Sequence, residues 1–133
     1  MKNIFLLTLL FCTGLSFAQK ATSNNTDAPL TIVEQMPSYK GGEAAMKKFI
    51  QKNVKYPKAE KEAGISGTCY ITFVVEKDGS LSDIRVLRGV PGGPGCDKEA
   101  VRVISRMKKW KPGKQNGKFV RVQFNLPIKY SFR

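Results

Sequence analysis

Hydrophobic and polar positions change their spacing several times along the chain, and the first regular spacing is helical. After Gly41-Gly42 one face of a predicted helix is apolar, and its members are Ala45, Met46, Phe49 and Ile50. Tyr56-Pro57 then opens a second, short helix, because a proline at the first helical position loses no hydrogen bond. Gly64 is a natural stop for this helix. Ahead of both helices, the brief apolar run Leu30 to Val33 predicts a short edge strand.

From Thr68 the spacing changes to two residues, which is typical of a strand with one buried face. The side chains predicted to point inward are those of Cys69, Ile71, Phe73 and Val75. The turn Lys77-Asp78-Gly79-Ser80 follows, and the apolar residues Ile84 and Val86 continue the alternation beyond it. This succession predicts a β-hairpin.

A third helix and a last strand follow. The glycine- and proline-rich loop 89–95 precedes the helix, Asp97 is its expected N-cap, and Trp110 closes it before Pro112-Gly113. In the last strand the inward residues are Val120, Val122, Phe124 and Leu126, and the outward ones are Arg121, Gln123 and Asn125. Pro127 places this strand at a sheet edge or in a bulge. The order helix, helix, strand, strand, helix, strand predicts an α+β fold, with a small antiparallel three-stranded sheet and helices packed on one face.

The start of the chain has the pattern of a secretory signal. A short basic start precedes the apolar run Ile4 to Leu15, and Ser16 and Ala18 supply the small residues before a cleavage site. The apolar run is short for a membrane anchor, although an uncleaved anchor is the alternative. We therefore expect a signal peptide at 1–18, a disordered lead-in at 19–29 and one domain at 30–133.

Net charge and the absence of histidine limit the classes of partner and site that the chain can have. The chain has 23 Lys and Arg against 10 Asp and Glu, a formal net charge of +13, which favours acidic partners. For an exported protein this points to anionic envelope surfaces or acidic protein segments, and not to nucleic acid. Without histidine the chain lacks the commonest metal ligand and the usual neutral-pH proton shuttle. The sequence thus predicts no metal site, no cofactor and no catalytic residues.

The remaining candidate chemistry lies in thiols and carboxylates. Cys69 and Cys96 are expected to form a disulfide in an oxidising compartment. One alternative is a redox thiol at Cys96, since a helix N-terminus lowers thiol pKa, and another is two buried, unpaired thiols. Glu60 and Glu62 lie beside lysines and are expected on a solvated helix face.

Several sequence motifs, taken in order, carry a family resemblance. They are Tyr56-Pro57, Gly64-Ile65-Ser66-Gly67, the turn Asp78-Gly79 and Lys109-Trp110-Lys111-Pro112-Gly113-Lys114. In this order, from about Val33 to the C-terminus, the chain resembles the TonB C-terminal domain family, as a short, stand-alone periplasmic member. In this resemblance Tyr56, Pro57, Trp110, Pro112 and Gly113 are structural residues.

The resemblance implies a binding role without enzymatic activity. In the family, the domain captures the N-terminal segment of outer-membrane TonB-dependent transporters as a strand added beside its own last strand, in support of energy-coupled transport. The edge implied to receive the segment comprises Val120, Arg121, Val122, Gln123, Phe124, Asn125 and Leu126. A proline at Val122 is expected to remove one edge N–H. Full transducers have a membrane helix and a long proline-rich span, and this sequence does not match that pattern. The resemblance therefore supports the binding role for this chain better than it supports energy coupling.

Other roles remain open at this level. An envelope adaptor that binds peptidoglycan or anionic surfaces through its basic residues is one, and a thiol-redox protein is another. An open edge also allows a homodimer formed by strand exchange.

Overall fold

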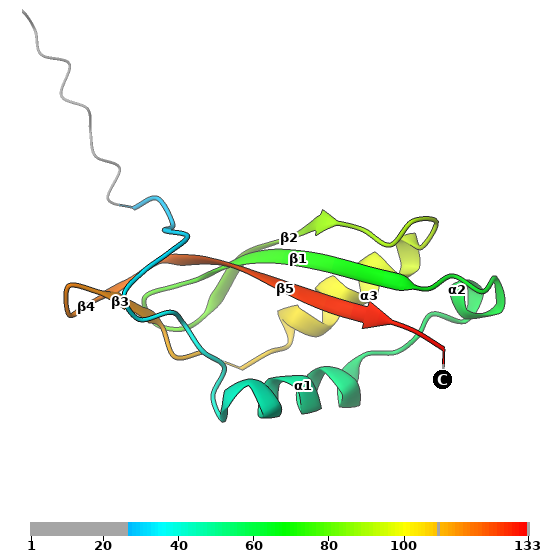
Figure 1. Cartoon of the computed structure of the whole chain (residues 1–133), viewed down its shortest axis with the longest axis horizontal. Helices are drawn as coiled ribbons and strands as arrows, with labels where there is room; N and C mark the ends of the chain where they lie inside the picture. The colour runs from blue at the N-terminus through cyan, green and yellow to red at the C-terminus, as the bar shows by residue number, and fades with distance from the viewer. Residues whose placement is uncertain (1–26, 109, 133) are drawn as a thin grey trace, which may run out of the picture.

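The computed structural model describes residues 27–108 and 110–132. The predicted signal peptide and residues 19–26 of the predicted lead-in lie outside this part. The elements in chain order are α1 (Gly42–Asn53), α2 (Lys58–Glu62), β1 (Gly67–Val75), β2 (Leu81–Arg88), α3 (Pro94–Ser105), β3 (Gly113–Gln115), β4 (Lys118–Val120) and β5 (Val122–Tyr130) (Figure 1). No helix in the described ranges is long and apolar enough to cross a membrane.

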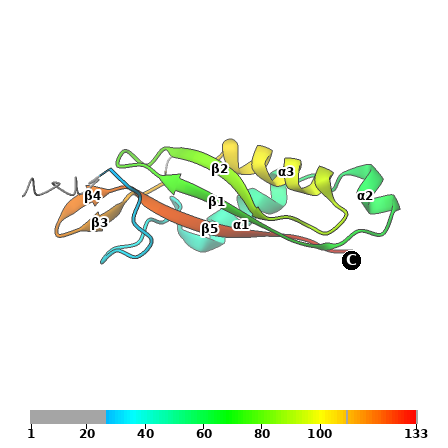
Figure 2. The same cartoon turned by 90° about the horizontal axis from the view of Figure 1, so that it is seen from above.

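The main sheet has three strands in the order β2-β1-β5, and both pairs are antiparallel. β5 follows β1 along its whole length, from Val122 opposite Val75 to Tyr130 opposite Gly67. Helix α3 covers one face of the sheet, and α1 runs below β5 in Figure 1 (Figures 1 and 2). The α+β architecture predicted from the sequence, with its three-stranded antiparallel sheet, is confirmed.

The core forms where β1, β5 and α3 meet. The four β1 positions predicted to point inward have no solvent exposure, as have Cys96, Ala100 and Ile104 of α3. Met46 and Ile50 of α1 pack against this core but stay partly exposed, and α1 has no fully buried residue. Helix α1 is therefore held to the core by one row of partly exposed side chains.

Trp110 is buried, at 2 % exposure, but it does not end the third helix. α3 stops at Ser105, and the chain continues so that the Trp110 N–H donates to the Gly79 carbonyl at 2.8 Å. The turn before β2 and the residues after α3 thus meet backbone to backbone. This contact could not be predicted from local sequence patterns, because its two partners lie far apart along the chain.

The predicted last strand is divided in two. Val120 belongs to β4 and lies opposite Gly113 of β3, in a separate two-stranded sheet. Asn116 and Gly117 turn between these strands with φ of 51° and 73°, as a two-residue Asn-Gly hairpin requires. The expected edge strand at Leu30 to Val33 is reduced to one bridge between Leu30 and Val122.

Two carboxylates have roles that the sequence did not predict. Glu60 is buried, and its Oε1 accepts the Gly95 N–H at 2.6 Å, so it satisfies an amide in the first turn of α3. Asp97 is not the N-cap, since α3 begins at Pro94 after Gly93. The Asp97 Oδ1 instead accepts the Val90 N–H at 2.9 Å and fixes the glycine- and proline-rich loop. The expected solvated position of Glu60 was wrong.

The structure has Cys69 and Cys96 as free, buried thiols, so the expected disulfide is not present. Burial is the main cause that raises the pKa of the Cys69 thiol, to about 12, and it also raises the pKa of Cys96. A redox thiol needs a lowered pKa and an exposed sulfur, so this alternative is contradicted as well. The third alternative, two buried and unpaired thiols, is the observed one.

We expect neither thiol to react with iodoacetamide in the folded protein, because both are buried and protonated near neutral pH. Labelling should appear only in denaturant. The check is mass spectrometry of the peptides that contain Cys69 and Cys96, after labelling with and without guanidinium. Rapid labelling of Cys96 in the native state would restore the redox interpretation.

Candidate functional site

The long free edge of β5 is the most distinctive surface of the fold. β5 pairs with β1 on one side only, and on its other side the described residues contribute a single parallel bridge, from Leu30 to Val122 (Figure 1). In that bridge the Leu30 N–H donates to the Arg121 carbonyl at 2.9 Å, and the Gln123 N–H donates to the Leu30 carbonyl at 2.7 Å. Unpaired strand edges accept further strands readily.

The bridge also fixes which backbone groups face outward. Since Arg121 and Gln123 bond to Leu30, their N–H and C=O groups point away from β1. These directions alternate along an antiparallel strand, so Asn125, Pro127 and Lys129 point the same way. The Val122 N–H consequently belongs to the β1 ladder. The expectation that a proline at Val122 would remove an edge donor was therefore wrong.

We call the carbonyls of Gln123, Asn125, Pro127 and Lys129, with the amides of Asn125 and Lys129, the outer row. Pro127 occupies an outward position, where its missing N–H costs nothing to the β1 pairing, and the register continues through it without a bulge. This confirms the edge alternative for Pro127. Leu30 bonds only to groups just before this row, and no described residue forms a backbone hydrogen bond to the outer row itself.

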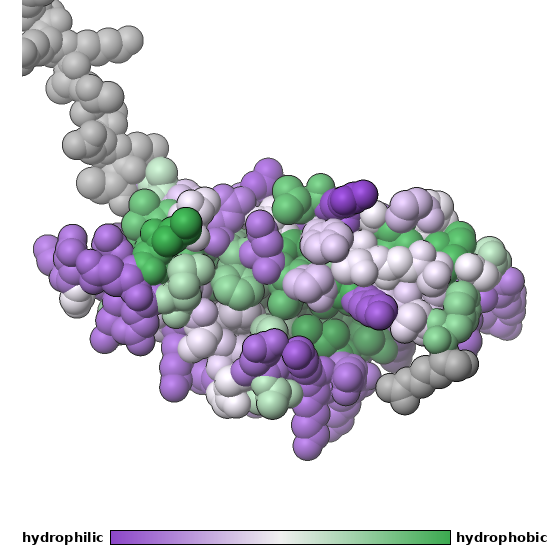
Figure 3. Space-filling model, viewed as in Figure 1, coloured by the Kyte–Doolittle hydropathy of each residue, from purple (hydrophilic) through white to green (hydrophobic). Residues whose placement is uncertain are grey.

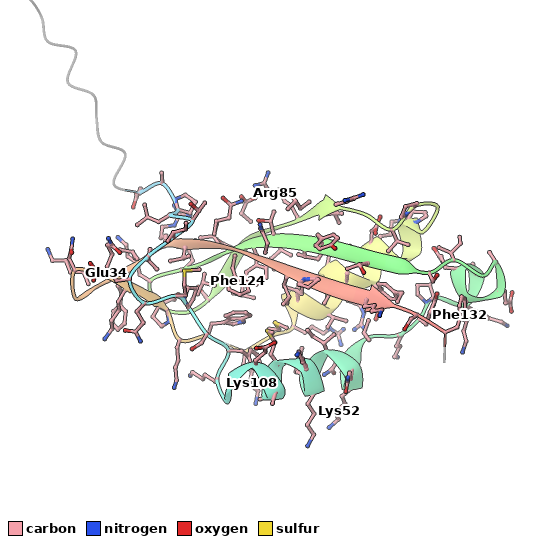
Figure 4. The ribbon with its side chains drawn as sticks, viewed as in Figure 1. Glu34, Lys52, Arg85, Lys108, Phe124 and Phe132 are labelled. Carbon is pink, nitrogen blue, oxygen red and sulfur yellow. The ribbon has the colours of Figure 1, made fainter. Side chains whose placement is uncertain are left out.

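A groove of about 360 Å³ runs beside the outer row, between β5 and the start of α1. We call it the Trp110 groove. Its apolar lining includes Tyr39, Met46, Trp110, Phe124, Leu126 and Pro127. Figure 4 shows Phe124 beside β5, on the side that faces α1, and Figure 3 shows apolar surface between β5 and the hydrophilic residues along α1.

Aromatic rings form the base of the Trp110 groove. The Trp110 ring lies 5.2 Å from Phe124, 5.4 Å from Phe73 and 5.8 Å from Tyr39, measured between centroids and in edge-on geometry. The Trp110 Nε1 is buried and has no hydrogen-bond acceptor among the described residues. Packed aromatic rings thus line the base of the groove beside one stretch of the open edge. The α1 residues at the side of the groove are only partly buried.

A second hollow of about 350 Å³ lies farther along the same edge. We call it the Lys129 hollow, and it is lined by Gln51, Val54, Tyr56, Lys129, Tyr130 and Ser131. Its rings are held in place, since the Tyr130 Oη donates to the Cys96 carbonyl at 2.8 Å and the Tyr56 Oη donates to the Ile65 carbonyl. Burial raises the pKa of the Tyr130 phenol, which keeps it a neutral donor.

The structure separates the seven residues that the sequence assigned to the binding edge. Val120 lies in β4, and the Arg121 carbonyl is bonded to Leu30. Gln123, Phe124, Asn125 and Leu126 do lie along the free edge of β5, where Asn125 is exposed and Leu126 is buried. Sequence reasoning missed Pro127 and Lys129, although the alternation could have been extended to both. It could not find Tyr39 and Met46, which reach the edge only through the fold.

Arg121 holds the beginning of β5 in place. Its guanidinium donates to both Glu76 carboxylate oxygens, at 2.8 and 3.1 Å, and also to the Asp27 carbonyl. The hydrogen bond from Arg121 is the main reason that the pKa of Glu76 lies below its ordinary value, with Ser82 next. The Arg121 side chain is thus engaged within the protein.

This ion pair gives a pH prediction. A carboxyl whose pKa is lower in the folded state contributes stability that is complete above its unfolded pKa, near 4.5, and is lost as pH falls through the folded pKa. Glu76→Gln should therefore cost stability at pH 7 and progressively less as the pH falls below 4.5. Urea unfolding at several pH values measures this. The control is Glu43→Gln, which breaks the exposed pair with Lys47 and should change the free energy of unfolding little. If the stability lost with Glu76→Gln did not depend on pH, the account would be contradicted.

Comparisons with known proteins identify a family and several similar structures. The family model of the Gram-negative bacterial TonB protein C-terminal region matches residues 52–132. An NMR structure of the Helicobacter pylori TonB C-terminal domain is 23% identical, with a TM-score of 0.49, over 66% of this chain and 90% of that one. The Pseudomonas aeruginosa TonB C-terminal domain is 26% identical, with a TM-score of 0.48, over 59% and 78%. A comparison with curated proteins found no match.

Proposed function

Because this chain belongs to the TonB C-terminal family, we propose that it captures an extended N-terminal segment of outer-membrane TonB-dependent transporters as a strand added to β5. The family takes part in TonB-dependent transport. We further propose that the binding takes place in the periplasm, with residues 1–18 removed on export and 30–133 as the binding domain. The role is recognition of a partner, without a chemical step.

The outer row is the observation that carries this proposal. It offers carbonyls and amides at the spacing of a strand, next to a three-stranded sheet that would become four-stranded on binding. Main-chain pairing needs no particular partner sequence, so the edge suits a segment whose side chains vary. Pro127 has no N–H to donate, but its carbonyl can still accept a hydrogen bond. The outer row therefore lacks one donor and no acceptor.

Backbone pairing alone gives modest affinity. Each added hydrogen bond contributes a net of about 1 kcal/mol, because both partners give up bonds to water. A short row of such bonds is further offset by the entropy of ordering the segment. Side chains of the partner must therefore add binding energy, and the Trp110 groove lies where they would pass.

Capture from envelope extract tests the proposal, with the unchanged protein beside two variants of Asn125. Asn125→Pro removes an outward N–H and places a ring on the edge, whereas Asn125→Thr changes the same side chain and keeps the N–H. Transporters should be retained by the unchanged protein and by Asn125→Thr, and lost with Asn125→Pro. Equal retention by all three forms would refute the proposed edge.

The net charge of +13 supports one rival, an envelope adaptor that binds peptidoglycan or anionic surfaces. Salt separates the two roles. Screening weakens binding through exposed charges, since the Debye length falls from about 10 Å at 0.1 M to about 3 Å at 1 M salt. Strand addition should persist in high salt, while the adaptor role predicts loss of binding there.

A further inference from the structure

We propose that the outward side of helix α1, together with the residues that follow α3, docks on an anionic phospholipid surface. We call this surface the basic face and define it by five exposed side chains, those of Lys40, Lys48, Lys52, Arg106 and Lys108. The inference goes beyond strand addition, because it concerns a surface other than the edge of β5. It follows from where the net charge lies in the sequence and from how the fold gathers it.

The net positive charge of the chain is concentrated in two short segments. Residues 40–55 contain five lysines and one carboxylate, and residues 98–111 contain six basic residues and one carboxylate. These two segments therefore hold nine of the thirteen net positive charges of the chain. The first segment contains α1, and the second contains most of α3 and the residues after it.

The fold places the two segments side by side. At the beginning of α1, the backbones of Ser38 and Lys111 are joined by two hydrogen bonds, of 3.0 and 2.8 Å. At its end, the Arg102 Nη2 donates to the Asn53 carbonyl at 2.9 Å. In Figure 4, Lys108 accordingly lies beside the first turn of α1. The charges of both segments thus contribute to one side of the molecule.

The lysines of α1 point away from the core. Met46 and Ile50 pack against the core, and at 3.6 residues per turn Lys48 and Lys52 lie on the opposite side of the helix. In Figure 4, Lys52 projects from α1 on the side away from the sheet, and Figure 3 shows hydrophilic side chains along this side. The Trp110 groove opens along another flank of α1, toward β5. A strand added to β5 would therefore leave the basic face uncovered.

The charges of the basic face are not neutralised within the protein. None of its five side chains forms an ion pair with a described residue. The two carboxylates of the segments are engaged elsewhere, since Glu43 pairs with Lys47 at 3.0 Å and Glu99 pairs with Arg102. The basic face therefore presents unpaired positive charge to solvent, which favours an anionic partner.

The form of the basic face favours a phospholipid surface over a sugar chain. Lysine ammonium groups are compact charges on flexible stems, and they bind phosphate groups without a fixed geometry. The outward row of α1, spaced by four residues, consists of Ala44, Lys48 and Lys52, and none of these offers a ring on which a sugar could stack. Each basic residue close to an anionic membrane strengthens binding about fivefold.

Co-sedimentation with lipid vesicles tests the inference. The probes are vesicles of phosphatidylcholine alone and vesicles in which about a third of the lipid is phosphatidylglycerol. At about 0.1 M salt we expect the protein to bind the anionic vesicles at least about tenfold more tightly. At about 1 M salt, where the Debye length is about 3 Å, it should remain in solution. Equal binding to both kinds of vesicle would overturn the inference.

A double variant assigns the binding to the basic face. Lys48→Gln with Lys52→Gln should weaken binding to the anionic vesicles about twentyfold and leave urea unfolding unchanged, since both side chains are exposed. The matched control is Lys77→Gln with Lys118→Gln, which removes the same charge from a separate hollow beside β4. It should weaken binding less than about threefold. Equal losses in the two double variants would overturn the inference, as would binding to isolated peptidoglycan in preference to the anionic vesicles.

Discussion

Gly79→Ala is expected to lower the free energy of unfolding by about 3 kcal/mol, a large effect for one added methyl group. Gly79 has a φ of 85°, in the region that favours glycine. A Cβ at this position would also lie 2.0 Å from the Trp110 carbonyl oxygen. The backbones cannot separate to make room without losing the bond from the Trp110 N–H to the Gly79 carbonyl. Urea unfolding measures the loss.

Gly117→Ala is the matched control. Gly117 also has a positive φ, of 73°, but a Cβ there would meet nothing within 4 Å. Its cost should be confined to backbone strain, about 1 kcal/mol. If both variants lose the same stability, the close approach of Gly79 and Trp110 does not constrain the fold. A larger loss at Gly79 would explain physically why an Asp-Gly turn and a tryptophan after the third helix occur together in this sequence.

Asn125→Pro is expected to weaken binding of a transporter segment by about tenfold or more, while stability changes little. The variant loses one hydrogen bond, about 1 kcal/mol, and its ring also obstructs the approaching strand. Stability should be kept because this N–H points away from β1, as at Pro127, which the strand already accommodates. Anisotropy and urea unfolding measure the two effects separately.

Val122→Pro should show the opposite behaviour. Val122 is fully buried and its N–H faces β1, so the variant should lose about 3 kcal/mol of stability or more. Pro127→Thr supplies the reverse test at the edge, because it restores a missing donor. One added hydrogen bond should tighten binding about fivefold. Weaker binding by Asn125→Thr than by Asn125→Pro would contradict the role of the backbone.

The open edge of β5 can bind a partner strand, but it can also promote aggregation. Free strand edges invite aggregation, and proteins protect them with prolines, lysines and polar side chains. β5 has Asn125, Pro127 and Lys129 at its outward positions, and Leu30 covers one end of the edge. These features limit pairing between copies of the protein while leaving most acceptors available to a single added segment.

Local patterns were sufficient for much of the fold. The alternation in β1 identified its four buried positions, and Gly64 does end α2 with a φ of 70°. The Ile65 N–H bonds to the Glu60 carbonyl and the Gly64 N–H to the Lys61 carbonyl, which completes a helix C-cap that the glycine signalled. Each of these features depends on residues close together in the sequence.

Features formed between distant segments could not be predicted in this way. Glu60 looked solvated because its partner, the Gly95 amide, belongs to a helix that begins much later. Val120 fitted the alternation of the last strand, yet it pairs with Gly113 across the Asn-Gly turn. For the candidate site, the pattern found the edge strand, but the Trp110 groove needs Tyr39 and Met46, and only tertiary packing places them there.

Hydrogen exchange at single amides tests strand addition to β5 most directly. The probe is a synthetic peptide copied from the N-terminal segment of a transporter retained in the capture experiment, added to isotope-labelled protein. We expect exchange at the Asn125 and Lys129 amides to slow at least about tenfold, since both become bonded. The Phe124 and Ile128 amides, already paired with β1, serve as internal references and should change little. A peptide that binds while Asn125 and Lys129 exchange as before would contradict the account.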